Sequence, residues 1–269
     1  MLCQRKRGVR IVKKKDLFRL EGKTAIVTGG SQGLGKQMAC ALAEYGANLV
    51  IAARKLERCE KAAAEISEMY GVKVVPLACD VSREEDIVAM VNRTREVFGR
   101  LDILVNNAGV TWGATAGEYP AAKWRQVLDV NLTGSFIAAR EAFQVMKGQG
   151  AGKIINLASV MGKVGAKEEV MDAVAYNASK GGIINLTRDL AVKWAPYGIN
   201  VNAISPGWFP THMAEKVIEM RRDLFLNMIP AGRFGNEEDL KGAVVYLASG
   251  ASDYVYGQVL SVDGGWCIH

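Results

Sequence analysis

The chain has 269 residues, 49% of them hydrophobic, a length and composition that suit one large globular domain with an ample core. No apolar run approaches the roughly 18–20 residues that span a membrane. The chain has only two histidines, and its five cysteines form no C-x-x-C pair, so the sequence shows no metal-ligand pattern. The cysteine spacing indicates reduced thiols in a cytoplasmic protein. The net charge of +6 arises at the N-terminus, because residues 1–19 hold eight of the 34 Lys and Arg residues but one of the 28 acidic residues, which leaves 26 basic and 27 acidic residues in the rest.

The chain begins with a basic segment, and we interpret residues 1–18 as an N-terminal extension and residues 19–269 as a single folded domain. A basic tail could bind nucleic acid or acidic lipid, or act in targeting. This tail lacks the serines and the long apolar stretch of a targeting peptide, so a solvated extension is the simpler interpretation. The balanced charge of the domain indicates neither a nucleic-acid nor a membrane partner.

Short apolar segments alternate with amphipathic ones along the domain. The amphipathic segments, for example Leu56–Tyr70 and Glu84–Phe98, predict helices. The repetition implies a parallel sheet with helices on both faces, which is a Rossmann-type, doubly wound α/β domain. Ligands of such sheets bind beyond the carboxyl ends of the strands. About seven strands are predicted: Thr24–Thr28, Asn48–Ala53, Val72–Ala78, Ile103–Asn106, Lys153–Leu157, Asn200–Ser205 and Gln258–Val262.

The first predicted strand is followed by a glycine-rich segment with the spacing G-x-x-x-G-x-G. Its glycines, Gly29, Gly33 and Gly35, would let the backbone turn tightly and approach a pyrophosphate. A helix that begins near Gly33 would direct its amides at that anion. Such a segment alone could be only a tight turn, but its place between a strand and a helix predicts a dinucleotide site. We assign to the same site the neighbouring residues Ser31, Gln32 and Leu34.

The second predicted strand leads into Arg54, and no carboxylate follows before Glu57. An NAD site usually places Asp or Glu about 20 residues past the glycines, where it binds the ribose 2′-hydroxyl. An arginine can instead hold a 2′-phosphate through two hydrogen bonds. The sequence therefore favours NADP(H) over NAD(H), although Arg54 could also be an ordinary exposed side chain at the start of a helix.

Polar or glycine residues follow the next four strands as well. Because the carboxyl ends of parallel strands meet at one edge of the sheet, we expect these residues to surround one ligand. Asp80 could instead cap the helix after Ser82, and Asn106–Gly109 could mainly stabilise the central strands. In chain order the residues are Asp80, Asn106–Gly109, Ser159 and the pair Pro206 and Gly207.

Tyr176 and Lys180 are four residues apart, so they would share one face of a helix. A neighbouring ammonium lowers the pKa of a phenol from about 10, and the phenol could then exchange a proton with a substrate oxygen. With 8 tyrosines and 18 lysines, about half an occurrence of Tyr-x-x-x-Lys is expected by chance. A second occurrence, Tyr119 and Lys123, contains Pro120, which we place at the first helical position, so that Tyr119 would lie outside the helix.

Together these motifs resemble the short-chain dehydrogenase/reductase family over about residues 17–266. The resemblance implies an oxidoreductase that transfers a hydride between NADP(H) and a secondary alcohol or ketone. Within the family the chain is most similar to gluconate 5-dehydrogenases and 3-oxoacyl-(acyl carrier protein) reductases, so that a keto sugar acid or an acyl thioester is the expected substrate. The motifs are Thr28–Gly35, Asn106–Gly109, Asn131, Ser159, Tyr176 with Lys180, Pro206 with Gly207, and Val262–Gly265.

The resemblance also implies roles for single residues. Tyr176 would be the general acid/base, and Lys180 would bind the nicotinamide ribose and lower the pKa of Tyr176. Ser159 would hydrogen-bond the substrate oxygen and Asn131 would support a water relay to Lys180, although a serine alone could be a helix cap and an asparagine alone a helix bend. The implied cofactor contacts are Asn107, Ala108 and Gly109 near the adenosine, Asp80 and Val81 at the adenine, and Pro206, Gly207, Phe209 and Thr211 near the carboxamide.

The segment between Ser159 and Tyr176 is about four residues longer than in many members of the family. We expect its part Lys163–Val174 to form a loop over the substrate, opposite an apolar wall of Trp208 and Phe209. The resemblance further implies a homotetramer that pairs helices around residues 121–146 and 175–194. Two other functions stay open: an isomerase or dehydratase that retains its cofactor, whose relatives are usually longer, and a non-catalytic nucleotide sensor, which the intact catalytic motif disfavours.

Overall fold

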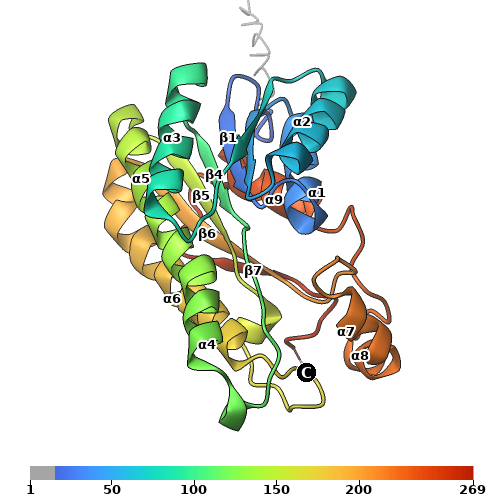
Figure 1. Ribbon diagram of the computed structural model, residues 1–269. Coiled ribbons are helices and arrows are strands. Elements are labelled where there is room, and N and C mark those ends of the chain that lie inside the picture. Colours follow the sequence, from blue (N-terminus) through green and yellow to red (C-terminus); the bar gives the residue numbers. More distant parts are fainter. Residues whose placement is uncertain (1–15, 269) are drawn as a thin grey trace, which may run out of the picture.

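The computed structural model describes residues 16–268, and the structural statements below refer to these residues. Residues 1–15 of the expected extension lie outside this range, so the boundary at residue 18 stays a prediction. Seven parallel strands form one sheet in the order β3-β2-β1-β4-β5-β6-β7 (Figure 1). The strands are β1 (Thr24–Thr28), β2 (Asn48–Ala53), β3 (Val74–Ala78), β4 (Ile103–Asn106), β5 (Gly152–Leu157), β6 (Ile199–Pro206) and β7 (Val259–Val262).

Helices cover both faces of the sheet, which confirms the predicted doubly wound fold. One layer contains α1, α2 and α9, and the other contains α3, α5 and α6 (Figure 1). In β1, Ala25 and Val27 pack into the first layer while Ile26 packs into the second, as the alternation of side chains along a strand requires. The helices are α1 (Gly33–Glu44), α2 (Leu56–Tyr70), α3 (Glu84–Phe98), α4 (Ala121–Leu128), α5 (Gly134–Gln149), α6 (Val174–Trp194), α7 (Glu215–Met220), α8 (Arg222–Met228) and α9 (Lys241–Ala248).

The sequence located the strands to within two residues, but it placed Pro120 one position too far into α4. Pro120 is the N-cap residue, and its carbonyl accepts a hydrogen bond from the Trp124 amide at 3.0 Å. Tyr119 lies outside the helix, as predicted. Its hydroxyl donates to the Trp112 carbonyl at 3.0 Å, and Lys123 Nζ lies 4.2 Å from the centroid of the Trp112 ring. Both members of the second Tyr-x-x-x-Lys pair are therefore engaged with Trp112.

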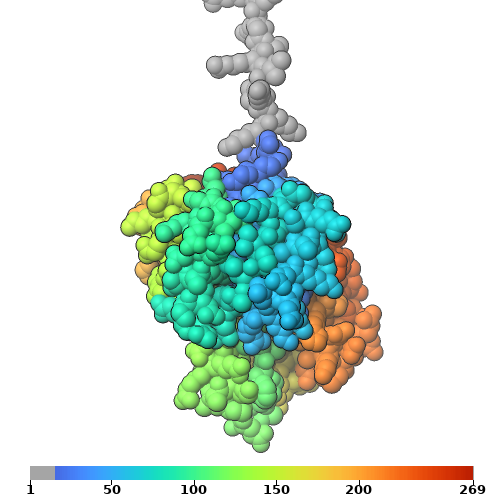
Figure 2. Space-filling model, turned by 45° about the horizontal axis from the view of Figure 1, so that its top comes forward, coloured from blue at the N-terminus to red at the C-terminus, as the bar shows by residue number. Residues whose placement is uncertain are grey.

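Three peripheral segments extend beyond the carboxyl edge of the sheet. They are residues 110–128, which include α4, the loop at residues 163–173, and α7 with α8; Figure 2 shows the first and last projecting from the rounded body. An aromatic cluster anchors the last segment: Trp208 stacks on Phe225 with ring centroids 3.9 Å apart, and Trp266 meets Trp208 edge-on at 5.7 Å. Within the described part of the chain, none of the helices has the length and apolar character needed to cross a bilayer.

Candidate active site

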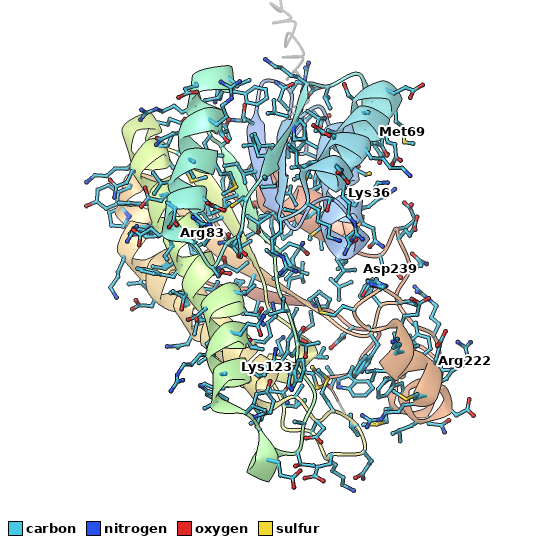
Figure 3. The ribbon with its side chains drawn as sticks, viewed as in Figure 1. Lys36, Met69, Arg83, Lys123, Arg222 and Asp239 are labelled. Carbon is cyan, nitrogen blue, oxygen red and sulfur yellow. The ribbon has the colours of Figure 1, made fainter. Side chains whose placement is uncertain are left out.

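A cavity of about 850 Å³ lies at the carboxyl edge of the sheet, between the body and the peripheral segments. Figure 3 labels Lys123 on α4 and Arg222 on α8, which belong to two of these peripheral segments. Every residue predicted to contact the cofactor lines it, and so do three of the four residues predicted to be catalytic. These are Gly29, Ser31, Gln32, Gly33, Leu34, Gly35, Arg54, Asp80, Val81, Asn107, Ala108, Gly109, Ser159, Tyr176, Lys180, Pro206, Gly207, Phe209 and Thr211.

The glycine turn after β1 has no room for a side chain at Gly29 or Gly35. Gly29 adopts a φ of +64°, in the region that favours glycine. A Cβ atom on Gly35 would lie 2.3 Å from the Gly29 carbonyl oxygen and 2.4 Å from Asn107 Nδ2. The Asn107 amide donates to the carbonyls of Thr28 at 2.9 Å and Gly29 at 3.2 Å, so the end of β4 holds the turn in place. The turn opens α1, whose amides are aimed into the cavity, an arrangement that fits a pyrophosphate.

The sequence left open whether Asn106–Gly109 mainly stabilises the central strands and whether Asp80 caps the helix after Ser82. Asn106 is buried, and its amide donates to Ser135 O and Asn156 Oδ1, both at 3.0 Å, which is a structural role between strands. Asp80 lines the cavity, but its Oδ1 also accepts bonds from the amide and hydroxyl of Ser82 at 3.0 and 2.7 Å. Burial would raise the pKa of Asp80, yet the bonds from Ser82 and the charge of Arg54 hold it below its usual value. Asp80 therefore both closes the turn before α3 and stands as a carboxylate in the cavity wall.

Arg54 follows β2 and is an exposed residue in the cavity wall. Its neighbours Lys55 and Leu56 bring no carboxylate to this part of the wall. Arg58, one turn into α2, donates from Nη1 to Gln32 Oε1 at 2.8 Å and so ties α2 to the glycine turn. A guanidinium beside the glycine turn, with no carboxylate on the residues that directly follow it, fits a nucleotide that carries a phosphate on its ribose.

Lys180 lies one turn after Tyr176 on α6, with Nζ 5.6 Å from the centroid of the phenol ring. It is 5% exposed, and its ammonium donates to the Leu157 carbonyl at 2.6 Å. Burial lowers the pKa of Lys180 from 10.5 to about 8. Ser159, at the end of β5, accepts a hydrogen bond from the Met161 amide at 3.2 Å and also hydrogen-bonds the Tyr176 phenol. The pair and the serine thus meet at one point of the cavity.

The predicted lowering of the Tyr176 pKa is wrong for this structure. Burial raises the pKa of the phenol, and the hydrogen bond with Ser159 offsets only part of that rise. Lys180 does not offset this rise, and its ammonium donates to the Leu157 carbonyl. Spacing along the helix placed the two residues correctly, but it could not include this competing partner.

Asn131 is the one predicted catalytic residue that does not line the cavity. It lies in a π-helical turn, Asp129–Thr133, which joins α4 to α5, and it is 1% exposed. Its Oδ1 accepts from the Val110 amide at 2.8 Å, and its Nδ2 donates to Val110 O at 2.9 Å and Ser179 Oγ at 3.0 Å. Asn131 therefore fixes the chain after β4 against α6 beside Lys180, and it marks a helix irregularity of the kind that is frequent at functional sites.

The remaining wall of the cavity comes from the 163–173 loop and the α7–α8 segment. The loop lies over this side, as expected, and hydrogen bonds attach it to other segments: the Ala114 amide donates to Asp172 O at 3.0 Å, Arg221 Nη1 donates to Val170 O at 2.8 Å, and Lys163 Nζ donates to Ser261 Oγ. Sequence reasoning missed most residues of this wall, because no motif marks them. One signal was present, because Met213, Val217 and Met220 follow the i, i+4, i+7 spacing of a helix face. Among the missed residues are Met171, Met213, Val217, Met220 and Arg221, together with Met161 and His212 beside them.

Trp208 and Phe209 differ in their surroundings. Both are buried and line the cavity, as expected for an apolar wall. Phe209 packs into the core under α1, where a Cβ on Gly235 would lie 2.3 Å from its ring. Trp208 belongs to the aromatic cluster, and its buried Nε1 has no hydrogen-bond partner among the described residues.

Comparisons with known proteins show what this chain is similar to. A family model described as Enoyl-(Acyl carrier protein) reductase matches residues 29–267. The chain is 39% identical over 254 residues to a 2-dehydro-3-deoxy-D-gluconate 5-dehydrogenase of Escherichia coli strain K12, covering 93% of this chain and 97% of that protein. It is 36% identical over 252 residues to a gluconate 5-dehydrogenase of Gluconobacter oxydans, covering 93% and 96%. A structure from Agrobacterium tumefaciens solved with bound NADP superposes with a TM-score of 0.85 at 38% identity, covering 95% of this chain and all of the other.

Proposed function

This chain belongs to the short-chain dehydrogenase/reductase family, and we infer that it is an oxidoreductase that transfers a hydride between NADP(H) and the CH–OH or carbonyl carbon of a small substrate. One observation carries this inference: Ser159, Tyr176 and Lys180 line the same cavity as the glycine turn and Arg54. A coenzyme bound at the glycine turn and a substrate beside Tyr176 could therefore occupy the same cavity. We propose NADP(H) as the coenzyme because Arg54 stands where a carboxylate would repel a 2′-phosphate.

In the direction of reduction, NADPH held by the glycine turn and Arg54 would supply a hydride for the substrate carbonyl. We propose that Ser159 and Tyr176 hold the carbonyl oxygen by hydrogen bonds and that Tyr176 donates the proton to it. The raised pKa of Tyr176 keeps the phenol protonated for that role. The pKa of Lys180, about 8, lets its ammonium return a proton to the site near neutral pH. Asn131 acts through Ser179 and the chain after β4 as a positioning residue.

We propose a keto sugar acid as the substrate, because relatives that align over most of the chain act on gluconates. A second candidate is an acyl thioester, as in 3-oxoacyl-(acyl carrier protein) reductases. The apolar residues Met161, Met171 and Val217 in the cavity wall favour this alternative, since they would suit an acyl chain.

The enzyme is further proposed to be a cytoplasmic homotetramer. Phe136 on α5 and Val192 on α6 are exposed by 39% and 77%, and apolar groups on helices already packed against a sheet favour burial in an interface. Light scattering at micromolar concentration should give about four times the chain mass of 29.1 kDa. A mass of one chain would contradict the tetramer.

The activity is tested by following NADPH absorbance at 340 nm with a panel of ketones. We expect oxidation with 5-ketogluconate, more slowly or not at all with a β-ketoacyl thioester, and more slowly with NADH than with NADPH. Faster turnover of the thioester would make an acyl thioester, and not a keto sugar acid, the proposed substrate. An enzyme that oxidises neither coenzyme with any ketone, although it binds NADPH, would support the nucleotide-sensor alternative.

A further inference from the structure

The substrate side of the cavity has three residues that can carry a positive charge besides Lys180. They are Arg125 on α4, His212 after β6, and Arg221 between α7 and α8. Arg125 and His212 are exposed, and Arg125 has Asp129, another lining residue, one turn further along the helix. Arg221 alone of the three is half-buried.

Arg221 is held in a fixed position. Its backbone amide donates to Val217 O at 3.1 Å at the end of α7, and its Nη1 donates to Val170 O at 2.8 Å across the gap to the 163–173 loop. Within residues 16–268 the Arg221 side chain has no hydrogen bond other than this one and forms no ion pair, not even with Asp172 in the neighbouring wall. A guanidinium has five N–H donors in a rigid planar fork, so most of its donors stay available for a ligand.

Apart from Asp172, the cavity wall near Arg221 includes three apolar residues. Met171 comes from the loop, and Val217 and Met220 come from α7. A half-buried guanidinium is less solvated than a fully exposed one, and an anionic ligand that pairs with it gains more than it would at an exposed site. The position therefore suits the carboxylate end of a substrate whose carbonyl lies at Tyr176.

We propose that Arg221 is the residue that selects anionic substrates, by binding the carboxylate of a keto acid with its free N–H groups while Nη1 retains the loop at Val170. This proposal rests on the proposed function, and it assigns the substrate's charged end to a named side chain. Arg221 belongs to the α7–α8 segment, and its guanidinium would contact both the loop and the ligand. The proposal therefore couples the loop to the α7–α8 segment when the ligand is bound.

The test compares 5-ketogluconate with its uncharged amide in the wild type, Arg221→Met and Arg221→Lys. For Arg221→Met we expect kcat/KM with the acid to fall about 10–100-fold, mainly through KM, since the variant loses the charge-assisted hydrogen bonds to the carboxylate. With the amide it should change less than about threefold. Arg221→Lys should recover part of the loss with the acid, because it keeps the charge and loses the fork.

The matched control is Arg222→Met, which removes the same charge from the next residue. Arg222 is exposed, lies over the Phe234 ring at 5.6 Å and does not line the cavity, so we expect kinetics like those of the wild type with both substrates. Equal losses with acid and amide in Arg221→Met would reduce Arg221 to a clamp for the loop and overturn the proposal. Equal losses in both arginine variants would show a general field effect and overturn it too. A wild type that turns over neither compound, but does reduce a thioester, would instead overturn the sugar-acid assignment on which the proposal rests.

Discussion

The turn after β1 and the α7–α8 segment line the same cavity, but they are held by different interactions. The turn follows a strand whose five residues are all buried, and backbone carbonyls and the Asn107 amide fix it with almost no free space. The α7–α8 segment is held by the Trp208 and Phe225 rings and by the bond from Arg221 to the loop. Backbone geometry thus shapes the cofactor half, and side chains shape the substrate half. We expect the first to tolerate few substitutions and the second to change specificity readily.

Tyr176 lies where the two halves meet, and its loss should have the largest effect on turnover. Tyr176→Phe removes only the hydroxyl, so kcat should fall about 10²–10⁴-fold, as is typical of general acid catalysis. The Kd for NADPH, measured by the fluorescence of the bound coenzyme, should change little because Lys180 and the glycine turn are intact. Retention of more than about a tenth of the wild-type kcat would remove Tyr176 from the chemistry.

In the cofactor half, Gly35→Ala should lower kcat/KM for NADPH by about 100-fold, because its Cβ would meet the Gly29 carbonyl at 2.3 Å and force the turn aside. Gly242→Ala on α9 is the control. A Cβ at Gly242 has nothing within 4 Å, so this variant should bind NADPH normally and gain up to about 1 kcal/mol in stability. Normal coenzyme kinetics in Gly35→Ala would mean that the glycine turn tolerates substitution as readily as the α7–α8 segment does.

Arg54→Ala separates the two coenzymes. The KM for NADPH should rise about 10–100-fold while that for NADH changes little, since only NADPH carries the 2′-phosphate that a guanidinium would bind. Arg93→Ala on α3, which removes an exposed arginine that pairs with Glu96 at 3.1 Å, should alter neither value. Equal increases for both coenzymes would assign Arg54 to a general role at the surface.

The smallest effect concerns the charge of Lys180 in the enzyme without ligands. Its pKa in the folded chain is about 8 and its ordinary value is 10.5, so between these values the unfolded chain binds more protons and wild-type stability should rise with pH. Lys180→Met lacks this dependence. Its free energy of unfolding relative to wild type should therefore fall by about 2 kcal/mol from pH 8 to pH 10, measured by urea denaturation. A pH-independent difference would place the folded pKa of Lys180 near its ordinary value.

The two halves also differ in how far the sequence predicts them. Residues such as Asp80 and Asn107 follow strand ends, and the parallel sheet brings strand ends to one edge, so periodicity alone brought them to the cofactor side. Arg221 and Met171 come from a helix end and a long loop, whose positions depend on contacts such as the bond to Val170. No local pattern encodes such contacts between distant segments.

The properties of the central residues were harder to predict than their positions. Asn131 was placed next to the catalytic pair, yet its amide is used by Val110 and Ser179 and does not reach the cavity. The pKa of Tyr176 was expected to fall and instead rises, since burial decides it. Spacing in a sequence fixes neighbours along a helix, but the electrostatics of a site depend on what is buried around them.

Trp208 gives the enzyme an optical reporter of its own state. The indole lines the cavity and stacks on Phe225, and its Nε1 lies buried without a partner. The emission of tryptophan overlaps the near-ultraviolet absorption of a reduced nicotinamide, so energy transfer should quench Trp208 when NADPH enters. A substrate that moves α7 and α8 would change the same signal by altering the stack with Phe225. Because the chain has five tryptophans, the part of a stopped-flow trace that Trp208→Phe removes would time coenzyme arrival and movement of α7 and α8, with no added label.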